Sequence, residues 1–411
     1  MINFFKKTHT LCFVVSLSFL LFQVSCGKKS SSSSTLADSA ANSWTGIKQL
    51  GVPGQDVYSD YIAPIYVDAS SNLYVSGYTS GNLAAGSGAS VGSFDAFVRK
   101  YDSSGTVEWT SQFGVAGLNT EACGVMTDSS GNFYVQGDTK ANLVSGSGAS
   151  TGSYEAYVIK FNSSGVKQWT QQLGVAGYAT YFGGVAVDGT GNVFISGTTT
   201  ANLVSGSGAS TGSYDAYVIK FNSSGVEQWT QQLGIAGYLA QGKGLAVDGT
   251  GNVFISGYTT ANLVIGSGAS TGSYDAYLIK FNSSGVEQWT QQLGVAGYLA
   301  QGRGLAVDGP GNAFISGVTS ANLVSGSGAS TGIRDAYLIK FNSSGVKQWT
   351  QQLGVAGYRT YGSGLAVDIA GDIILGGTSD GNLNTGSGDS IGGAGHWDTF
   401  IARFNSAGVL R

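Results

Sequence analysis

Residues 252–293 read NVFISGYTTANLVIGSGASTGSYDAYLIKFNSSGVEQWTQQL, and this stretch alone predicts the fold. It contains three short runs rich in β-branched and aromatic residues, at 252–257, 275–281 and 286–293, with Gly, Asn and Ser between them. Such runs are typical of β-strands bounded by turns. A fourth run of the same kind precedes them at 244–248, and no segment keeps a helical period. We therefore expect four antiparallel strands.

The run at 275–281 is apolar on both of its faces, with Tyr277 and Ile279 on one and Leu278 on the other. A strand of this kind is expected between two neighbouring sheets. The last run is more polar, as an outer edge strand should be, and its Trp289 is expected to pack between sheets.

The chain repeats this pattern every 60 residues from Trp44 onward. The period is marked by Trp109, Trp169, Trp229, Trp289 and Trp349. A second series is Asp68, Asp128, Asp188, Asp248, Asp308 and Asp368, and a third is Asp95, Glu155, Asp215, Asp275, Asp335 and, three residues late, Asp398. Residues 189–248 and 249–308 differ at five positions, Thr198/Tyr258, Ser205/Ile265, Val218/Leu278, Ile235/Val295 and Lys243/Arg303. A fixed period of this length predicts a repeat architecture.

Four strands in each unit of about 60 residues predict the blades of a β-propeller. The first three strands occur six times, and the fourth occurs five times and once more at Trp44 to Leu50. We therefore predict an all-β, six-bladed β-propeller over residues 44–411. Its N-terminal strand is expected to complete the last blade and close the ring.

The pattern G-N-V-F-I-S-G, then D-A-Y-V-I-K-F-N-S-S-G, then W-T-Q-Q-L-G resembles the bacterial SBBP repeat, which is named for a seven-bladed β-propeller. The resemblance covers residues 44–411. Because we count six units, the blade number of the family is not carried over. The resemblance implies an exported or surface protein, in a family whose members mostly lack a defined activity.

The N-terminus predicts export. Lys6 and Lys7 precede an apolar run of about a dozen residues, which is too short to span a bilayer. The following Gln23-Val24-Ser25-Cys26 resembles a bacterial lipoprotein signal, with Gln23 where Leu is usual. We predict a signal peptide at 1–25, a lipid-bearing Cys26 with a Ser-rich tether at 26–43, and anchoring to a membrane, the outer one by expectation. An ordinary signal peptide with a chance Cys26 is the alternative.

Composition narrows the possible functions. The chain has 66 Gly, 3 Pro, 42% hydrophobic and 11% charged residues, which excludes collagen-like and mainly disordered classes. A net charge of −4 without a basic run argues against nucleic-acid binding. Cys12 leaves with the signal and Cys26 is the expected anchor, so Cys123 remains as a small half-buried residue. We expect no cofactor and no metal site.

Function is expected on the blade end that carries the longer loops, because rigid scaffolds present binding residues on variable loops. The links between blades, at 179–183, 239–243 and 359–363, differ most among the repeats, and two insertions mark the blade that closes the ring. The candidate binding residues are Asp56, Tyr58, Asp60, Tyr61, Tyr181, Lys243, Arg303, Arg359, Tyr361, His396 and Trp397.

The sequence favours a non-enzymatic scaffold that binds a protein or a glycan, because one His and one free Cys in the mature chain are a poor inventory for catalysis. Two alternatives stay open. One is a propeller hydrolase or lyase with a site at the closing blade. The other is a structural lipoprotein that assists outer-membrane assembly.

Overall fold

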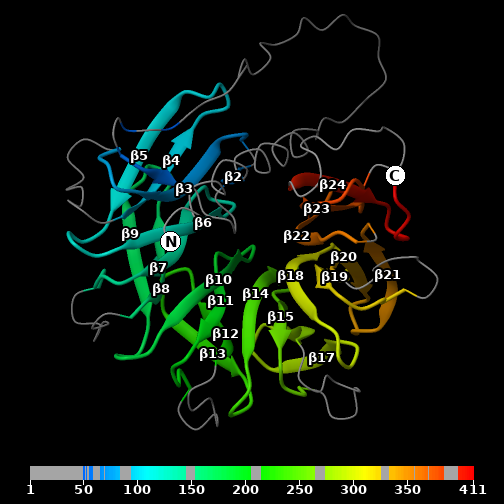
Figure 1. The fold of residues 1–411 in the computed structure, drawn as a ribbon. Coiled ribbons are helices and arrows are strands. Elements are labelled where there is room, and N and C mark those ends of the chain that lie inside the picture. The colour runs from blue at the N-terminus through cyan, green and yellow to red at the C-terminus, as the bar shows by residue number, and fades with distance from the viewer. Residues whose placement is uncertain are drawn as a thin grey trace, which may run out of the picture. The chain divides into compact units, whose positions relative to one another are not determined.

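The computed structural model describes residues 50, 52, 55–58, 65–68, 70–83, 94–144, 153–204, 214–263, 274–324, 333–355, 357–368, 370–383 and 397–411. Every helix or strand assigned in these ranges is a β-strand (Figure 1). The chain divides into two units, Met1–Gly177 and Tyr178–Arg411. The prediction of an all-β fold is confirmed.

The first unit holds two antiparallel sheets. One contains β1 (Val57–Tyr58), β2 (Ile65–Val67), β3 (Leu73–Thr79), β4 (Asp95–Tyr101) and β5 (Val107–Phe113), with β1 and β2 both paired to β3. The other contains β6 (Thr120–Thr127), β7 (Phe133–Thr139), β8 (Glu155–Phe161) and β9 (Lys167–Leu173) in that order.

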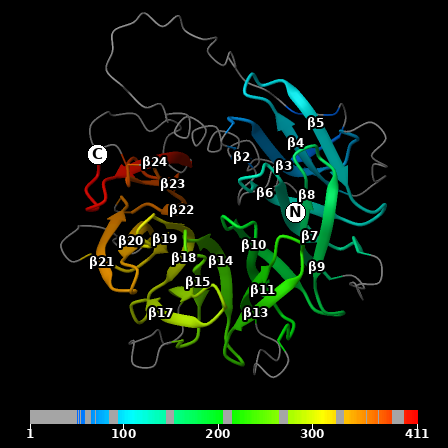
Figure 2. The same cartoon turned by 180° about the vertical axis from the view of Figure 1, so that it is seen from behind.

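The second unit holds four sheets, and each follows the chain order. They contain β10 (Thr180–Val187), β11 (Val193–Thr199), β12 (Asp215–Phe221) and β13 (Glu227–Leu233); then β14 (Ala240–Val247), β15 (Val253–Thr259), β16 (Asp275–Phe281) and β17 (Glu287–Leu293). The next has β18 (Ala300–Val307), β19 (Ala313–Thr319), β20 (Asp335–Phe341) and β21 (Lys347–Leu353), and the last has β22 (Thr360–Val367), β23 (Ile373–Ser379) and β24 (Asp398–Phe404). Figure 2 shows the four first strands of this unit next to one another and the fourth strands β13, β17 and β21 on its outer side.

The turn between the first and second strands is fixed by an aspartate. Asp248 Oδ1 accepts hydrogen bonds from the backbone N–H groups of Thr250 and Asn252 at 2.9 and 3.0 Å, and Oδ2 accepts from the Asn252 side chain at 2.8 Å. This is the Asx-turn chemistry for which Asp is favoured in turns.

The third strands β4, β8, β12, β16 and β20 are almost wholly buried and form the core of their sheets, whereas β24 of the last sheet is mostly half-buried. All seven residues of β16 are buried, whereas β17 begins with exposed residues. The expected Trp contact is confirmed: Trp289 packs on the cluster of Ile315 and Ile339, and its Nε1 donates to Ser343 O in the next sheet at 3.2 Å. Gly345 follows that turn with φ +81°, and a Cβ there would lie 2.7 Å from the Trp289 ring, so only Gly fits.

A glutamine in each fourth strand fixes both ends of the connection between the second and third strands. Gln292 Nε2 donates to Asp275 Oδ2 at 2.9 Å and to Ala261 O at 2.8 Å, while Oε1 accepts from Leu263 N–H at 2.7 Å. The same contact recurs at Asp95, Glu155, Asp215 and Asp335, so the acidic residue that begins these third strands is part of blade construction.

The predicted start of the first strands was wrong. The segments interpreted as links between blades, at 179–183, 239–243 and 359–363, belong almost wholly to β10, β14 and β22. Each of these strands contains a bulge, for example between Gly242 and Gly244. A bulge interrupts the alternation of inward and outward side chains, so the strand pattern cannot be recognised in the sequence. Tyr181, Lys243 and Tyr361 are therefore strand residues. Arg303 of β18 is likewise a strand residue.

The first insertion was also misplaced. Asp56 and Tyr58 were assigned to the closing blade, but Val57–Tyr58 is strand β1 of the first sheet and pairs with Tyr78 and Thr79 of β3. Three of the five extra residues therefore fall between β1 and β2, which together take the place of one strand in the other sheets.

Several predictions fall on residues outside the described ranges. These are the signal at 1–25, Cys26 and its tether, most of the strand at Trp44 to Leu50, Asp60, Tyr61 and His396. Cys123 is buried, at 3% exposure, rather than half-buried as expected. In the described part of the chain no helix has the length and apolarity needed to cross a membrane.

Candidate functional site

An unusually wide bulge in β18 shapes the candidate site. In β14 the pairing with the next strand shifts between Gly242 and Gly244, whereas in β18 it is interrupted from Gly302 to Leu305, around Arg303. The hydrogen bonding of the tyrosine below the bulge also differs between the two sheets. Tyr277 Oη donates to Gln241 O at 2.8 Å, but the equivalent Tyr337 hydroxyl is buried and has no hydrogen-bond partner in the described structure.

Tyr361 of β22 holds two arginines from the neighbouring sheet. The Arg303 guanidinium lies 5.1 Å from the centre of the Tyr361 ring, and that of Arg334 lies 5.6 Å from it. Arg334 Nη1 also donates to Tyr361 Oη at 2.8 Å. Both cations are thus placed against the same aromatic ring, an arrangement that favours guanidinium groups.

Arg334 reaches this position because it stands at a junction between sheets. It immediately precedes β20, and its carbonyl accepts a hydrogen bond from Thr360 N–H at the start of β22, at 2.8 Å. A short parallel bridge between Arg334 and Arg359 adds to this junction. Backbone pairing, rather than a loop, therefore sets the position of the Arg334 side chain.

Trp397 and Arg359 extend the group on the β24 side. The rings of Tyr361 and Trp397 lie 5.4 Å apart between centres, and the Arg359 guanidinium lies 6.0 Å from the Trp397 ring. Arg359 Nε is 3.7 Å from Asp380 Oδ2, and the Arg359 backbone N–H donates to the same carboxylate. We call Arg303, Arg334, Arg359, Tyr361 and Trp397 the Arg303 cluster.

The preceding sheet contributes the Tyr258 side chain and the backbone of the β14 bulge to the border of the cluster. Tyr258 interacts electrostatically with Arg303 and packs edge-on against Tyr274, with ring centres 5.2 Å apart. Lys243 lies on the bulge of β14 beside Gly244, where a Cβ would come within 3.0 Å of Arg303 O.

The cluster concentrates positive charge in an acidic protein. It contains three of the six arginines of a chain whose net charge is −4. Among the described residues, the carboxylate of Asp380 lies within ion-pair distance of Arg359, and no carboxylate is shown within that distance of Arg303 or Arg334. Burial, together with repulsion from Arg334, lowers the pKa of Arg303, while nearby tyrosines counteract this. A bound anion would offset the cost of holding this guanidinium away from water.

The side chains gathered here suit binding more than proton transfer. Guanidinium groups donate several hydrogen bonds in a planar fork that matches carboxylates and sulfates. Flat aromatic rings beside them offer apolar surface for a ring-shaped ligand. Within the described residues no group of three His, Cys, Asp or Glu side chains could hold a metal ion.

The structure unites part of the predicted set. Arg303, Arg359, Tyr361 and Trp397 lie in one cluster, while Lys243 is on the β14 bulge whose Gly244 backbone lies next to Arg303 O. Sequence reasoning missed Arg334 and Tyr258. The signals were present, because Tyr258 is one of the five differences between adjacent repeats. Arg334 replaces the aromatic residue found at Phe94, Tyr154, Tyr214 and Tyr274.

The remaining predicted residues lie elsewhere. Tyr181 holds the position of Tyr361 in β10, and its carbonyl accepts from Tyr217 Oη at 3.2 Å. Tyr58 packs with Tyr78 and Phe94 in the first unit, with ring centres 5.2 and 5.7 Å away. Burial and the nearby Asp56 carboxylate raise the pKa of Tyr58.

Repeated four-stranded antiparallel sheets define a β-propeller-type repeat protein. Four segments match the model of the SBBP repeat, described as a β-propeller repeat: residues 168–203, 228–263, 288–323 and 348–384. The chain therefore carries SBBP β-propeller repeats, as the sequence pattern predicts. Each match begins in the fourth strand of one sheet and continues through the first two strands of the next.

A curated relative is regulatory protein FlaEY of Caulobacter vibrioides. It is 28% identical over 320 residues, which cover 70% of this chain and 33% of FlaEY. The chain thus spans about a third of the length of that relative.

Similar solved structures include a protein of unknown function from Bacteroides caccae, at 11% identity and a TM-score of 0.40, covering 76% of this chain and 88% of that one. A PL25 ulvan lyase is 12% identical with a TM-score of 0.41, covering 79% of this chain and 82% of the lyase. These similarities are too low to assign a blade number or an activity to this chain.

Proposed function

We propose that the protein is an exported, lipid-anchored β-propeller that binds an anionic glycan at the Arg303 cluster without catalysing a reaction. The observation that carries the proposal is the placement of Arg303 and Arg334 against Tyr361. Two like charges on one ring repel each other, so the arrangement gains stability when a carboxylate or sulfate lies between them.

The aromatic rings favour a sugar among anionic ligands. Tyr361 and Trp397 lie beside one another, with Tyr258 and Tyr274 bordering the cluster. Aromatic faces next to charged donors suit a ligand that presents an apolar ring face and an acidic group together. The bulge and backbone pairing hold the cations in place before binding, which lowers the entropic cost of association.

Binding of polygalacturonate by the full chain, measured by calorimetry against uncharged dextran, tests the proposal. Arg303→Ser and Arg334→Tyr install the residues of equivalent repeats, Ser363 and Tyr274, so both variants should fold. Each is expected to lower the affinity about 10- to 100-fold, from roughly 1.5–3 kcal/mol per charged hydrogen bond. Added salt should weaken binding further, because charge attraction is screened.

Lys347→Ala is the matched control, because Lys347 is an exposed cation on the outer strand β21. This variant should bind polygalacturonate as the natural chain does. Equal affinity for dextran, or unchanged affinity in both arginine variants, would contradict the proposal.

We also propose the closed six-bladed ring and the lipid at Cys26. The ring is supported by the last sheet, which has three strands in the described residues while the other sheets of the second unit have four. Gln49-Leu50-Gly51-Val52 matches Gln352-Leu353-Gly354-Val355, the end of the fourth strand β21 and its continuation. Anchoring at Cys26 is supported by the sequence of the export signal.

A further inference from the structure

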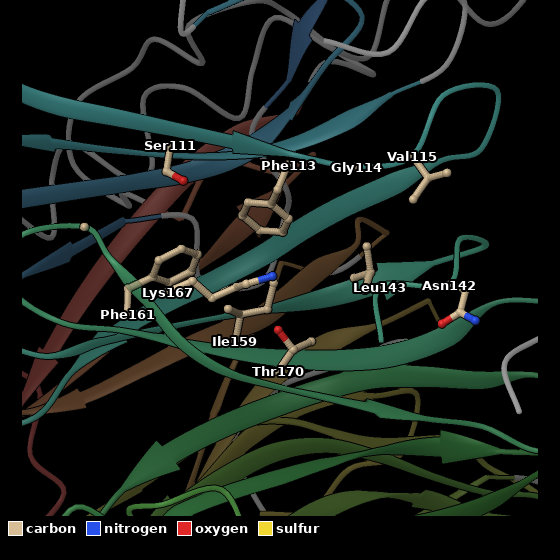
Figure 3. Close-up of a pocket in the computed structure, with 11 residues that line it drawn as sticks. Ser111, Phe113, Gly114, Val115, Asn142, Leu143, Ile159, Phe161, Lys167 and Thr170 are labelled. Carbon is tan, nitrogen blue, oxygen red and sulfur yellow. The ribbon is translucent and has the colours of Figure 1, made fainter. Parts of the chain in front are cut away.

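A cavity that shares no residue with the Arg303 cluster lies between the two sheets of the first unit. It has a volume of about 330 Å³, within the usual range of small-molecule sites. One wall comes from the end of β5, with Ser111 and Phe113, and the other from β8 and β9, with Ile159, Phe161 and Thr170. Figure 3 shows Lys167 extending into the space between these walls.

An aromatic side chain lies between the two sheets where later sheets have a smaller one. Phe133 begins β7 at a position that holds Val193, Val253 or Ala313 in later sheets. It stacks on Trp109 and on Phe161, with ring centres 4.8 Å away in both cases. A ring in place of a smaller side chain is expected to hold the two sheets further apart.

The polar bridges found between sheets of the second unit are missing here. Trp289 Nε1 and Lys280 Nζ both donate to Ser343 O of the next sheet, at 3.2 and 3.0 Å. At the junction in the first unit the Trp109 Nε1 is buried with no partner in the described structure. Lys100 instead pairs with Glu108 of its own sheet at 2.8 Å.

A shorter side chain leaves the space open. Gln231 Nε2 crosses to Gly285 O of the next sheet at 3.0 Å. The residue equivalent to Gln231 in the first sheet is Ser111, and the residue equivalent to Gly285 is Gly165. Both line the cavity, and a serine is too short to make the bridge that a glutamine makes.

A lysine in place of a glutamate gives the cavity a positive charge that suits an anion. Thr230 Oγ1 donates to Glu227 Oε1 at 2.6 Å, and the same pair recurs at Thr290. In β9 the acid is replaced by Lys167, which cannot accept a hydrogen bond. The Thr170 hydroxyl is buried without a partner in the described residues, and Lys167 lines the same cavity.

The geometry points to a binding site for a small organic carboxylate that carries one ring. Phe113, Phe161 and Ile159 would cover the ring, while Lys167 and the Thr170 and Ser111 hydroxyls would donate to the carboxylate. No carboxylate side chain is among the residues that line the cavity. Charge complementarity and the unused donor therefore select an anionic, partly apolar ligand over a neutral one.

Calorimetric titration of the full chain with 3-phenylpropionate, compared with 3-phenylpropan-1-ol, tests the site. The carboxylate should bind about tenfold more tightly than the alcohol, because Lys167 makes a charge-assisted hydrogen bond only to the former. Lys167→Glu should abolish this preference, and Ser111→Gln should weaken both ligands by filling the cavity. Both variants copy residues of other repeats, Glu227 and Gln231, so folding should be preserved.

Lys347→Glu is the control, since it makes the same exchange at the equivalent position of β21. It should leave binding unchanged, as should Arg303→Ser, which separates this site from the proposed glycan site. Equal binding of the acid and the alcohol, or full binding in both Lys167→Glu and Ser111→Gln, would overturn the inference.

Discussion

At the scale of single residues, hydrogen bonds to Asp248 illustrate how the repeated turns contribute to stability. Partial burial raises the pKa of Asp248, but hydrogen bonds from Asn252 and Thr250 outweigh burial and hold the pKa below the ordinary value of 3.8. A carboxyl whose pKa is lower in the folded state stabilises the fold when it is ionised. This contribution is complete above pH 3.8 and is lost as the pH falls through the folded-state pKa.

Asp248→Ala is therefore expected to lower the free energy of unfolding by about 1–3 kcal/mol at pH 7, because two backbone donors lose their acceptor. The difference between the variant and the natural chain should shrink as the pH falls below 3.8, because the carboxyl of the unfolded chain then takes up a proton before that of the folded chain does. Denaturant unfolding at pH 7 and pH 3 measures both values. A difference that stays constant with pH would contradict this account.

At the scale of elements, a glutamine of the fourth strand joins that strand to the third strand and to the connection that precedes it. Gln292 spans from Asp275 to the Ala261 and Leu263 backbone. Asp275 is 1% exposed, so loss of a donor there leaves part of a buried carboxylate unsatisfied.

Gln292→Ala should destabilise the sheet of β14–β17 by about 2–4 kcal/mol and speed amide hydrogen exchange at Leu263, whose acceptor is removed. Gln288→Ala is the control, because Gln288 is exposed and donates to Val286 O within its own turn. Hydrogen exchange followed by mass spectrometry compares the two. Equal protection of Leu263 in both variants would refute the role of Gln292.

The sequence pattern predicted the strands, the turns and the packed tryptophans, because each depends on residues near one another in the chain. The beginning of the first strands was not predictable, because the bulge at Gly242 and Gly244 breaks the alternation on which a strand prediction depends. Arg334 was missed because its partner Tyr361 is on another sheet. The cavity at Ser111 was missed because it is recognised only by comparison with Gln231, which bridges to the next sheet where Ser111 is too short to do so.

At the scale of the whole molecule, the proposed ring closure makes a specific prediction about register. Ala336 lies opposite Leu353 between β20 and β21, and the residues that match them are Thr399 and Leu50. Opposed residues of antiparallel strands have Cα atoms about 4.5–5.5 Å apart, which suits a disulfide.

Leu50→Cys with Thr399→Cys, in a Cys123→Ser background, should form a disulfide that changes mobility in non-reducing electrophoresis. Leu50→Cys with Ala402→Cys should not, because residue 402 is three positions further along β24. Crosslinking of both pairs alike, or of neither, would exclude the predicted register.

The likeness of adjacent sheets also bears on how the chain folds. Contacts within each sheet join residues that are close in sequence, so folding can begin in any sheet and spread to its neighbours. Residues 189–248 and 249–308 differ at five positions, so the edge of one sheet offers nearly the same surface as that of the next. A sheet that forms early can therefore dock on the wrong neighbour, and slow rearrangement of misdocked sheets is the expected kinetic cost of near-perfect repetition.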